Sequence, residues 1–224
     1  HYGKLVAQLA ASVRDLSRAE DAVQETFLRA HKAWPNQGIP DAPAAWLLTT
    51  ARRIILDQKR HDITTHTFAK DYADTHDEMS GVSSISEFVF PDARLKLMYV
   101  CAHPALDAGM HAPLMLQTVL GLTAEHIAQA FAVSPTTMGQ RLVRAKRKIK
   151  DAHIPFLIPD AEDIDARTDT VLSAVYAAYG TAWNDAGLGH DTAADNLGDE
   201  AIYLARLMCQ LVPNNPEAKG LLSL

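Results

Sequence analysis

The chain has 224 residues, enough for about one large domain or two to three small ones, and its 48% hydrophobic and 21% charged residues favour a folded protein over a disordered one. Two cysteines, Cys101 and Cys209, are too few for a disulfide framework. No apolar run approaches the roughly 20 residues that cross a bilayer, so we expect a cytoplasmic protein with no membrane contact.

The formal net charge of −6 does not by itself indicate a nucleic-acid partner, but the charge is uneven along the chain. From Arg141 to Lys150 there are six Lys or Arg and no acid, whereas Asp151 to Glu200 holds eleven Asp or Glu and one base, Arg167. Electrostatic fields decay within about 10 Å at moderate salt, so a nucleic acid responds to the local basic stretch. The two adjacent blocks also predict that the acidic segment Asp160–Glu200 folds against the basic helix Arg141–Lys150 and masks it.

Helical periodicity begins at residues 4–34. One face of this stretch is expected to carry Val23, Phe27, Ala30 and Trp34, which recur at offsets of four, three and four. Asp15 and Ser17 are candidate caps for the second helix of the stretch, and Pro35 with Gly38 predicts its end.

Further along, a helix is expected over about 44–60. Residues 61–91 lose the periodicity and predict a linker, long enough to favour a functional or inter-domain role. Helices are then expected over 92–102, over 112–120 and over 163–224, the last with an interruption at 187–190. We find no sustained strand-period alternation, so the predicted fold class is all-α.

Residues 123–150 carry the pattern of a helix-turn-helix. Thr123 is a candidate cap for a first helix, and Ala132 and Val133 form the turn. Ser134 then caps a second helix that starts with Pro135, a favoured arrangement because the first helical N–H is unsatisfied in any case. Many such turns have Gly where Ala132 stands, and Gly tolerates a positive φ more easily.

The second helix of this motif is amphipathic. Its predicted buried stripe is Met138, Leu142, Ala145 and Ile149. The residues predicted to face outward are Thr136, Thr137, Gln140, Arg141, Arg144, Arg147 and Lys148. The first of these residues can reach the edges of the nucleobases in the major groove of DNA. The basic residues farther along the helix can contact phosphates. The alternative is an ordinary helical hairpin with a solvated basic end.

Three stretches resemble extracytoplasmic-function (ECF) bacterial sigma factors, in that family's order and spacing. The sequence 15–30, DLSRAEDAVQETFLRA, is similar to their polymerase-binding helix. Residues 46–53, WLLTTARR, continuing through Asp57 and Arg60, resemble their promoter-melting helix. The helix-turn-helix, ending in RLVRAKR at 141–147, resembles the module that reads the upstream promoter element.

The resemblance implies a modular all-α organisation. Residues 1–61 would form sigma region 2, residues 62–91 a linker, and residues 92–155 the region 4 helix-turn-helix. Residues 156–224 would form a C-terminal helical extension, truncated in this chain. Patterns at 91–95, 101–106 and 145–156 are similar to a subgroup whose extension consists of tetratricopeptide-like helices.

The resemblance also implies a polymerase-binding face on the first sigma-like helix. This face consists of Asp21, Gln24, Glu25 and Leu28. It points away from the predicted apolar stripe, and its acids would meet basic partners on the largest polymerase subunit. Without the family, a solvated polar face is the more ordinary interpretation.

A basic ridge is expected on the next helix, opposite Leu47, Ala51 and Ile54. The ridge consists of Arg52, Arg53, Lys59 and Arg60, which include pairs seven residues apart. Such a ridge suits the backbone of single-stranded DNA. The resemblance implies that residues 61–67 lie near a loop that holds an unstacked base and helps to open the duplex. Many relatives have Asn where Arg53 stands, and Trp46 is expected in the core.

No enzymatic site is expected. Cys101, His103 and His111 lack the spacing of a metal site, and Cys101 is predicted to be a buried small apolar residue. We find neither a nucleophile motif nor a Gly-rich phosphate loop, so no catalytic residue, metal or cofactor is expected.

The leading hypothesis is therefore a promoter-specificity subunit, with core RNA polymerase and promoter DNA as partners. On this hypothesis the acidic segment masks the basic helix until core polymerase binds. An anti-sigma or other regulatory protein is left open as a further partner. The alternatives are a stand-alone helix-turn-helix regulator that binds DNA without polymerase, and an interaction scaffold in which residues 160–224 bind a protein.

Overall fold

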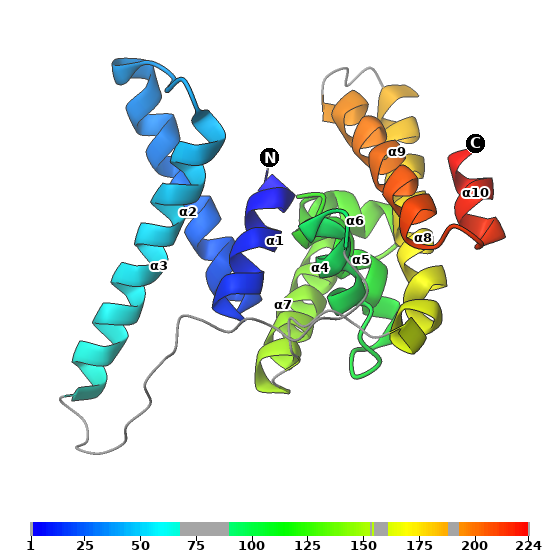
Figure 1. The fold of residues 1–224 in the computed structure, drawn as a ribbon, viewed down its shortest axis with the longest axis horizontal. Helices are drawn as coiled ribbons and strands as arrows, with labels where there is room; N and C mark the ends of the chain where they lie inside the picture. The colour runs from blue at the N-terminus through cyan, green and yellow to red at the C-terminus, as the bar shows by residue number, and fades with distance from the viewer. Residues whose placement is uncertain (1, 68–89, 153, 155–160, 188–192, 224) are drawn as a thin grey trace. The chain divides into compact units, whose positions relative to one another are not determined.

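The computed structural model describes residues 2–67, 90–152, 154, 161–187 and 193–223. Within these ranges the regular structure is entirely helical, which confirms the all-α prediction (Figure 1). No helix in these ranges is long and apolar enough to span a membrane. The predicted linker lies mostly at 68–89, outside the described residues.

Contacts divide the chain into two compact units. One contains residues 1–20 and 88–224, and the other contains residues 21–87. The division falls within helix α2 (Leu16–Gln37), after Glu20.

The unit of residues 21–87 consists, where described, of the rest of α2 and of helix α3 (Pro43–Thr67). The rings of Trp34 on α2 and Trp46 on α3 meet edge to face, with centroids 5.7 Å apart. Gly38 has φ +81°, a conformation that Gly adopts at little cost, and follows directly after the last residue of α2. The predicted end at Pro35 and Gly38 is therefore confirmed, with Pro35 in the last turn.

Two details of this unit differ from the sequence prediction. Phe27 is partly exposed, and the neighbouring Thr26 is buried in its place. Thr26 is accommodated because its hydroxyl donates to the carbonyl of Ala22 at 2.7 Å, which satisfies the polar atom locally. Helix α3 continues to Thr67, beyond the predicted end at residue 60.

The other unit begins with helix α1 (Tyr2–Val13), which packs on α4 (Ala93–Cys101). Asp92 caps α4 by accepting from the N–H of Arg94 at 2.8 Å. Six of the nine residues of α4 are buried, as expected of a helix covered on several sides. Helices α5 (Ala108–Thr118), α6 (Ala124–Ala130) and α7 (Pro135–Asp151) follow, and α5 contacts α4, α6 and α7.

Helix α5 starts earlier than predicted. Its cap is Asp107, whose carboxylate accepts from the N–H of Gly109 at 2.8 Å. Pro113 lies inside the helix, and its ring is buried. The apolar periodicity was too short here to mark the first turn, whereas Gly121, with φ +73°, closes the segment as expected.

The C-terminal segment is a pair of packed helices, α8 (Ala161–Gly187) and α9 (Ala193–Leu211), followed by α10 (Pro216–Leu222) (Figure 1). Asn215 caps α10 by accepting from the N–H of Ala218 at 2.8 Å. Helix α10 lies against both α8 and α9.

Helices α8 and α9 are attached to α4 by polar contacts, of which those to α8 are buried. The hydroxyl of Tyr99 on α4 lies 2.9 Å from that of Thr168 on α8. The guanidinium of Arg167 donates to the carbonyl of Tyr99 at 3.2 Å. On the α9 side, Arg94 pairs with Glu200 and lies over the ring of Tyr203, 5.0 Å from its centroid. The extension is therefore packed into the same unit as the helix-turn-helix.

Candidate nucleic-acid interface

The helix-turn-helix forms over α6 and α7 with the predicted caps. Thr123 accepts from the N–H of His126 at 3.3 Å, and Ser134 accepts from the N–H of Thr137 at 3.1 Å. Ala132 adopts φ +51° in the turn between them. A residue with a side chain thus occupies the left-handed conformation that Gly would adopt more easily.

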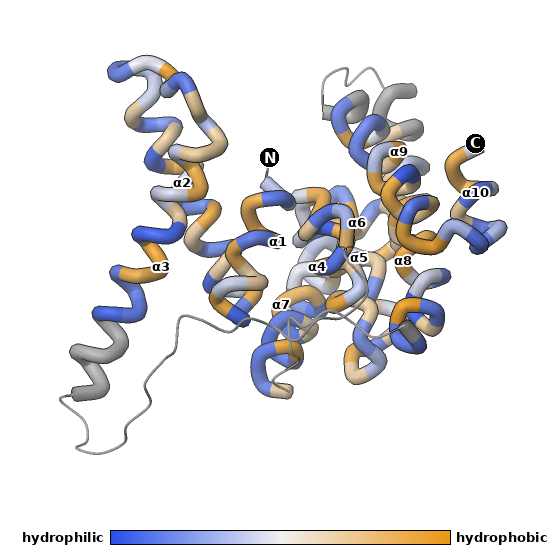
Figure 2. Tube along the Cα trace, in the orientation of Figure 1, coloured by the Kyte–Doolittle hydropathy of each residue, from blue (hydrophilic) through white to orange (hydrophobic). Residues whose placement is uncertain are grey.

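Helix α7 buries one stripe, and most of its other residues are exposed. Figure 2 shows that hydrophobic and hydrophilic residues are mixed along this helix. The buried stripe is Met138, Leu142, Ala145 and Ile149, as predicted. The residues predicted to contact DNA lie outside this stripe: Thr136, Gln140, Arg141, Arg144, Arg147 and Lys148 are exposed, and Thr137 is half-buried. Most of this surface is open to a partner.

The structure divides the basic residues of α7 into separate groups. Arg144 follows Arg141 by three residues and Lys148 follows Arg144 by four. The three side chains therefore share one flank of the helix. They line a cavity of about 380 Å³ together with the first turn of α5, including Asp107. We call these three residues the open flank.

The opposite flank of α7 is occupied by acids from the start of α2. The ammonium of Lys146 lies 2.7 Å from a carboxylate oxygen of Glu20, and that of Lys150 lies 3.5 Å from one of Asp15. We call these two lysines the paired flank. These two lysines were not among the residues predicted to contact DNA, although Lys146 follows Leu142 by one turn and so had to lie beside the buried stripe.

Arg147 projects away from the buried stripe and pairs with Asp151 one turn later at 3.3 Å. Both side chains are exposed, so this pair contributes little to stability.

The acidic extension has other partners. Within the described residues, Asp163 pairs with Arg167 at 2.6 Å and Glu200 pairs with Arg94, so both meet bases outside α7. The expectation that the segment 160–200 covers the basic helix therefore finds no support in these ion pairs.

The face of α2 predicted to bind polymerase lies at the surface. Asp21, Gln24 and Leu28 are exposed, and Glu25 is half-buried. Glu25 also accepts from Arg29 at 3.0 Å in a pair one turn apart. The face is polar with one protruding apolar side chain, because the helix buries Ala22, Val23, Thr26 and Ala30 instead.

The predicted basic ridge on α3 also forms. Arg52, Arg53 and Arg60 are exposed and Lys59 is half-buried, while Leu47, Ala51 and Ile54 are buried as predicted. Arg60 lies 3.6 Å from Asp57, and both side chains are largely exposed, so solvent screens this pair. Residues 61–67 continue the helix.

Cys101 is fully buried, as predicted, and its thiol lies 3.7 Å from the hydroxyl of Thr118. Burial raises the pKa of this thiol to about 12, so it is a poor nucleophile and metal ligand. His103 and His111 are engaged with the backbone: Nδ1 of His103 accepts from the N–H of Ala105 at 3.1 Å, and Nε2 of His111 lies 3.2 Å from the carbonyl of His103.

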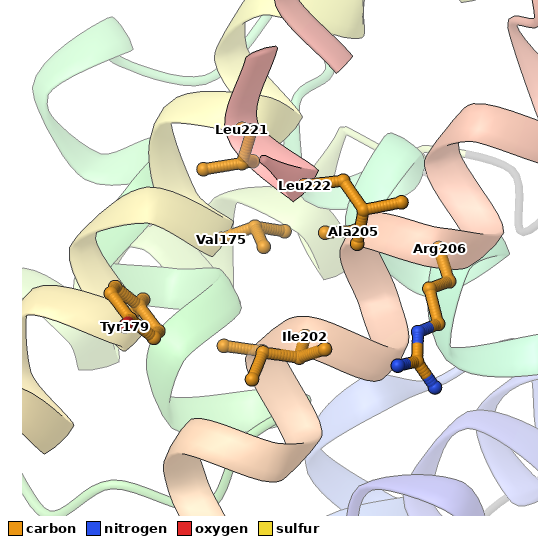
Figure 3. Close-up of a pocket in the computed structure, with 8 residues that line it drawn as sticks. Val175, Tyr179, Ile202, Ala205, Arg206, Leu221 and Leu222 are labelled. Atoms are coloured by element: carbon orange, nitrogen blue, oxygen red, sulfur yellow. The ribbon is translucent and has the colours of Figure 1, made fainter. Parts of the chain in front are cut away.

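A second pocket, of about 350 Å³, lies in the extension (Figure 3). Its walls come from Val175 and Tyr179 on α8, from α9, and from Leu221 and Leu222 on α10. They are mainly apolar, with Arg206 of α9 as the charged residue of the lining.

Comparison with known families finds matches in two parts of the chain. Residues 1–62 match the Sigma-70 region 2 family. This region 2 segment contains the α2 face and the α3 ridge described above. Residues 167–224, in α8 to α10, match a family of unknown function, DUF6596. No solved structure matches.

Among curated proteins, an uncharacterised protein of Rhizobium meliloti is 37% identical over 216 residues, which cover 94% of this chain and 50% of that protein. A probable ECF RNA polymerase sigma factor, SigI, of Mycobacterium tuberculosis is 29% identical over 164 residues, covering 72% of this chain and 56% of that protein. The ECF sigma factor SigE of Mycolicibacterium smegmatis is 27% identical over 135 residues, covering 59% and 51% respectively. The chain thus spans about half the length of these relatives.

Proposed function

We propose that this chain acts as an ECF sigma factor, which directs bacterial RNA polymerase to specific promoters and helps to open the DNA there. One observation carries the proposal: a region 2 segment at residues 1–62 and a capped helix-turn-helix with an exposed basic surface occur in one chain. The chemistry of transcription would belong to the polymerase, and this chain would supply recognition.

The residues fall into three roles in this proposal. The exposed face at Asp21, Gln24, Glu25 and Leu28 binds core polymerase, where acids suit a basic partner surface. The ridge at Arg52, Arg53, Lys59 and Arg60 follows the backbone of the opened strand near the start site. Helix α7 enters the major groove of the upstream element.

On α7, we infer different tasks for the two ends. Thr136, Thr137 and Gln140 lie near the N-terminus of the helix and offer hydroxyl and amide groups to base edges. The open flank then contacts phosphates, which fixes the register of the helix. Arg147 is the weaker candidate for a phosphate contact because it already has a carboxylate partner, Asp151.

The same proposal assigns the C-terminal helices α8 to α10 to a tetratricopeptide-like extension. A packed helix pair followed by a third helix is the arrangement that a tetratricopeptide-like extension would have. An anti-sigma or other regulatory protein is a further proposed partner.

The test is run-off transcription with purified core polymerase on a promoter library, combined with capture of core polymerase by the full chain. We expect R141A/R144A to lose promoter-dependent transcript while still capturing core polymerase, because those arginines lie on the DNA-binding helix. The matched control is R206A/K219A, which removes the same charge from α9 and α10 and should retain transcription.

Failure of the intact chain to capture core polymerase would contradict the proposal. Tight, specific duplex binding without such capture would favour the stand-alone regulator, and unchanged activity of R141A/R144A would favour the scaffold.

A further inference from the structure

The cavity between α5 and α7 is a fixed part of the fold. It has a volume of about 380 Å³, and its walls are the open flank of α7 and the segment of residues 106–110, which leads into α5 and forms its first turn. Helices α5 and α7 contact each other and belong to one compact unit. Packing therefore holds both walls in place.

The basic wall of this cavity has no carboxylate partner. Arg141, Arg144 and Lys148 are exposed, and none of them forms an ion pair within the described residues, whereas the other three basic residues of α7 each do. The Nε of Arg144 donates to the carbonyl of Gln140 at 3.3 Å, which orients the guanidinium. Its terminal nitrogen atoms remain available to a ligand.

The wall on the α5 side carries one acid, Asp107. One oxygen of its carboxylate accepts from the N–H of Gly109 at 2.8 Å as the cap of α5. Asp107 lines the same cavity as the open flank, yet it forms no ion pair in the described part of the chain. Opposite charges that line one cavity without pairing leave space between them. A ligand with an anionic end and a hydroxyl-bearing end can occupy that space.

The floor of the cavity is apolar. Leu106, Met110 and Ala145 line it and are buried. The thioether of a methionine makes favourable contacts with aromatic rings. The volume falls within the range of about 300–1,000 Å³ that is typical of sites for small organic ligands, and a single phosphate ion would leave most of it empty. Contact with a DNA backbone alone requires neither this floor nor the acid.

We propose that this cavity binds a nucleoside diphosphate or triphosphate. The open flank holds the phosphates, because guanidinium and ammonium groups form charge-assisted hydrogen bonds to phosphate oxygens. Asp107 accepts from the ribose hydroxyls with its remaining oxygen, as acids do in other nucleotide sites, and the nucleobase lies against Met110. Three cations against one carboxylate give the lining a net charge of +2, which complements a diphosphate.

The consequence of this site for promoter binding rests on the proposed function. The open flank cannot hold nucleotide phosphates and DNA phosphates at the same time. Each ligand therefore weakens the binding of the other by the same factor. Recognition of the upstream element by α7 then depends on the concentration of the nucleotide.

Isothermal titration calorimetry of the full chain with ADP, inorganic pyrophosphate and adenosine tests the site at about 150 mM salt. ADP should bind at least about tenfold more tightly than pyrophosphate, because only ADP also reaches Asp107 and Met110. Adenosine should bind more weakly than ADP, since it leaves the cations unoccupied. R144A/K148A should weaken ADP binding by at least about tenfold. The control R206A/K219A removes the same charge from α9 and α10 and should bind ADP as the wild type does.

A further variant, D107N, separates the two ends of the ligand. Asn keeps the cap of α5 and removes the negative charge. Pyrophosphate should then bind more tightly, because the cations no longer share the cavity with an acid. The preference for ADP over pyrophosphate should fall by about tenfold, because the ribose loses a charged acceptor. Circular dichroism verifies that each variant is folded.

The outcomes separate this site from the proposed function. Equal affinities for ADP and pyrophosphate, or ADP binding unchanged in R144A/K148A, would overturn the inference, because general attraction of anions to α7 would then suffice. Saturating ADP should also lower the affinity for a labelled duplex, measured by fluorescence anisotropy, and an unchanged affinity would contradict the shared use of the cations. Promoter-dependent transcription by a chain that binds no ADP overturns the nucleotide site alone. ADP binding at the cavity by a chain that captures no core polymerase overturns the proposed function alone.

Discussion

Tyr99 is fully buried in α4, and its hydroxyl is engaged with Thr168 of α8. Burial raises the pKa of Tyr99 to about 12, although the hydrogen bond to Thr168 acts in the opposite direction. Above pH 10 the unfolded chain releases this proton while the folded chain keeps it, so the stability of the fold falls as pH rises from about 10 to 12.

We predict that Y99F lowers the free energy of unfolding by about 1 kcal/mol at neutral pH, because a buried hydrogen bond is lost. The same variant should lose part of the alkaline destabilisation of the wild type, an effect on the order of 2 kcal/mol. Urea unfolding at pH 8 and pH 11 measures both. Identical pH dependence of wild type and variant would contradict the assignment of this titration to Tyr99.

A second prediction at this scale concerns Gly3. G3A should destabilise the chain by about 1–3 kcal/mol, because its Cβ would meet the backbone of Val119 and force α1 away. The matched control is G180A in α8, where an added Cβ meets nothing within 4 Å. That change should stabilise the helix by about 0.5–1 kcal/mol. Thermal unfolding distinguishes the two, and a stabilising G3A would show that α1 is not seated against Val119.

At the scale of elements, Arg94 joins α4 to α9. Its guanidinium donates to both carboxylate oxygens of Asp92, at 3.1 and 2.9 Å, while it pairs with Glu200 and lies over Tyr203. Burial acts to raise the pKa of Asp92, but the bonds from Arg94 outweigh it and hold that pKa below its usual value.

We predict that R94A costs about 3–5 kcal/mol of stability, because two carboxylates at a largely buried site lose their cation. R94K should recover only part of this loss, since an ammonium cannot form the planar pair or the same stacking. The control is R29A on α2, whose pair with Glu25 is about half exposed and should cost under about 1 kcal/mol. Urea unfolding of the three variants measures these differences. Equal losses of unfolding free energy in R94A and R29A would contradict the role of Arg94 in holding α4 and α9 together.

At the scale of the whole molecule, the extension completes the packing of the helix-turn-helix unit. Helix α8 contacts both α4 and α5, and α9 brings Met208 to the Tyr99 hydroxyl at 3.9 Å. Removal of residues 161–224 should therefore expose apolar surface of α4 and α5, with increased binding of a hydrophobic dye and a lower unfolding temperature. A chain ending at residue 214 loses only α10 and should be affected less. Equal dye binding by both truncations would show that α8 and α9 fold independently of α4.

Much of the local structure could be predicted from single residues. Thr123 and Ser134 cap helices as hydroxyl side chains do before a helix, and the stripe of α7 follows from helical periodicity. Phe27 is an exception. Periodicity assigned it to the core, but neighbouring packing exposed it and buried Thr26, whose hydroxyl found a backbone acceptor.

For the candidate interface, the amino-acid pattern was enough to predict that α7 is a capped basic helix with one buried side, because caps and periodicity are properties of adjacent residues. Which basic side chains of α7 are available to a partner depends on the tertiary packing. Glu20 precedes Lys146 by more than a hundred residues, and the two meet because the N-terminal helices pack on the unit that holds α7. Ion pairs form between groups that packing brings together, so proximity along the chain accounts for the exposed pair of Arg147 with Asp151 but not for the pairs of Lys146 and Lys150.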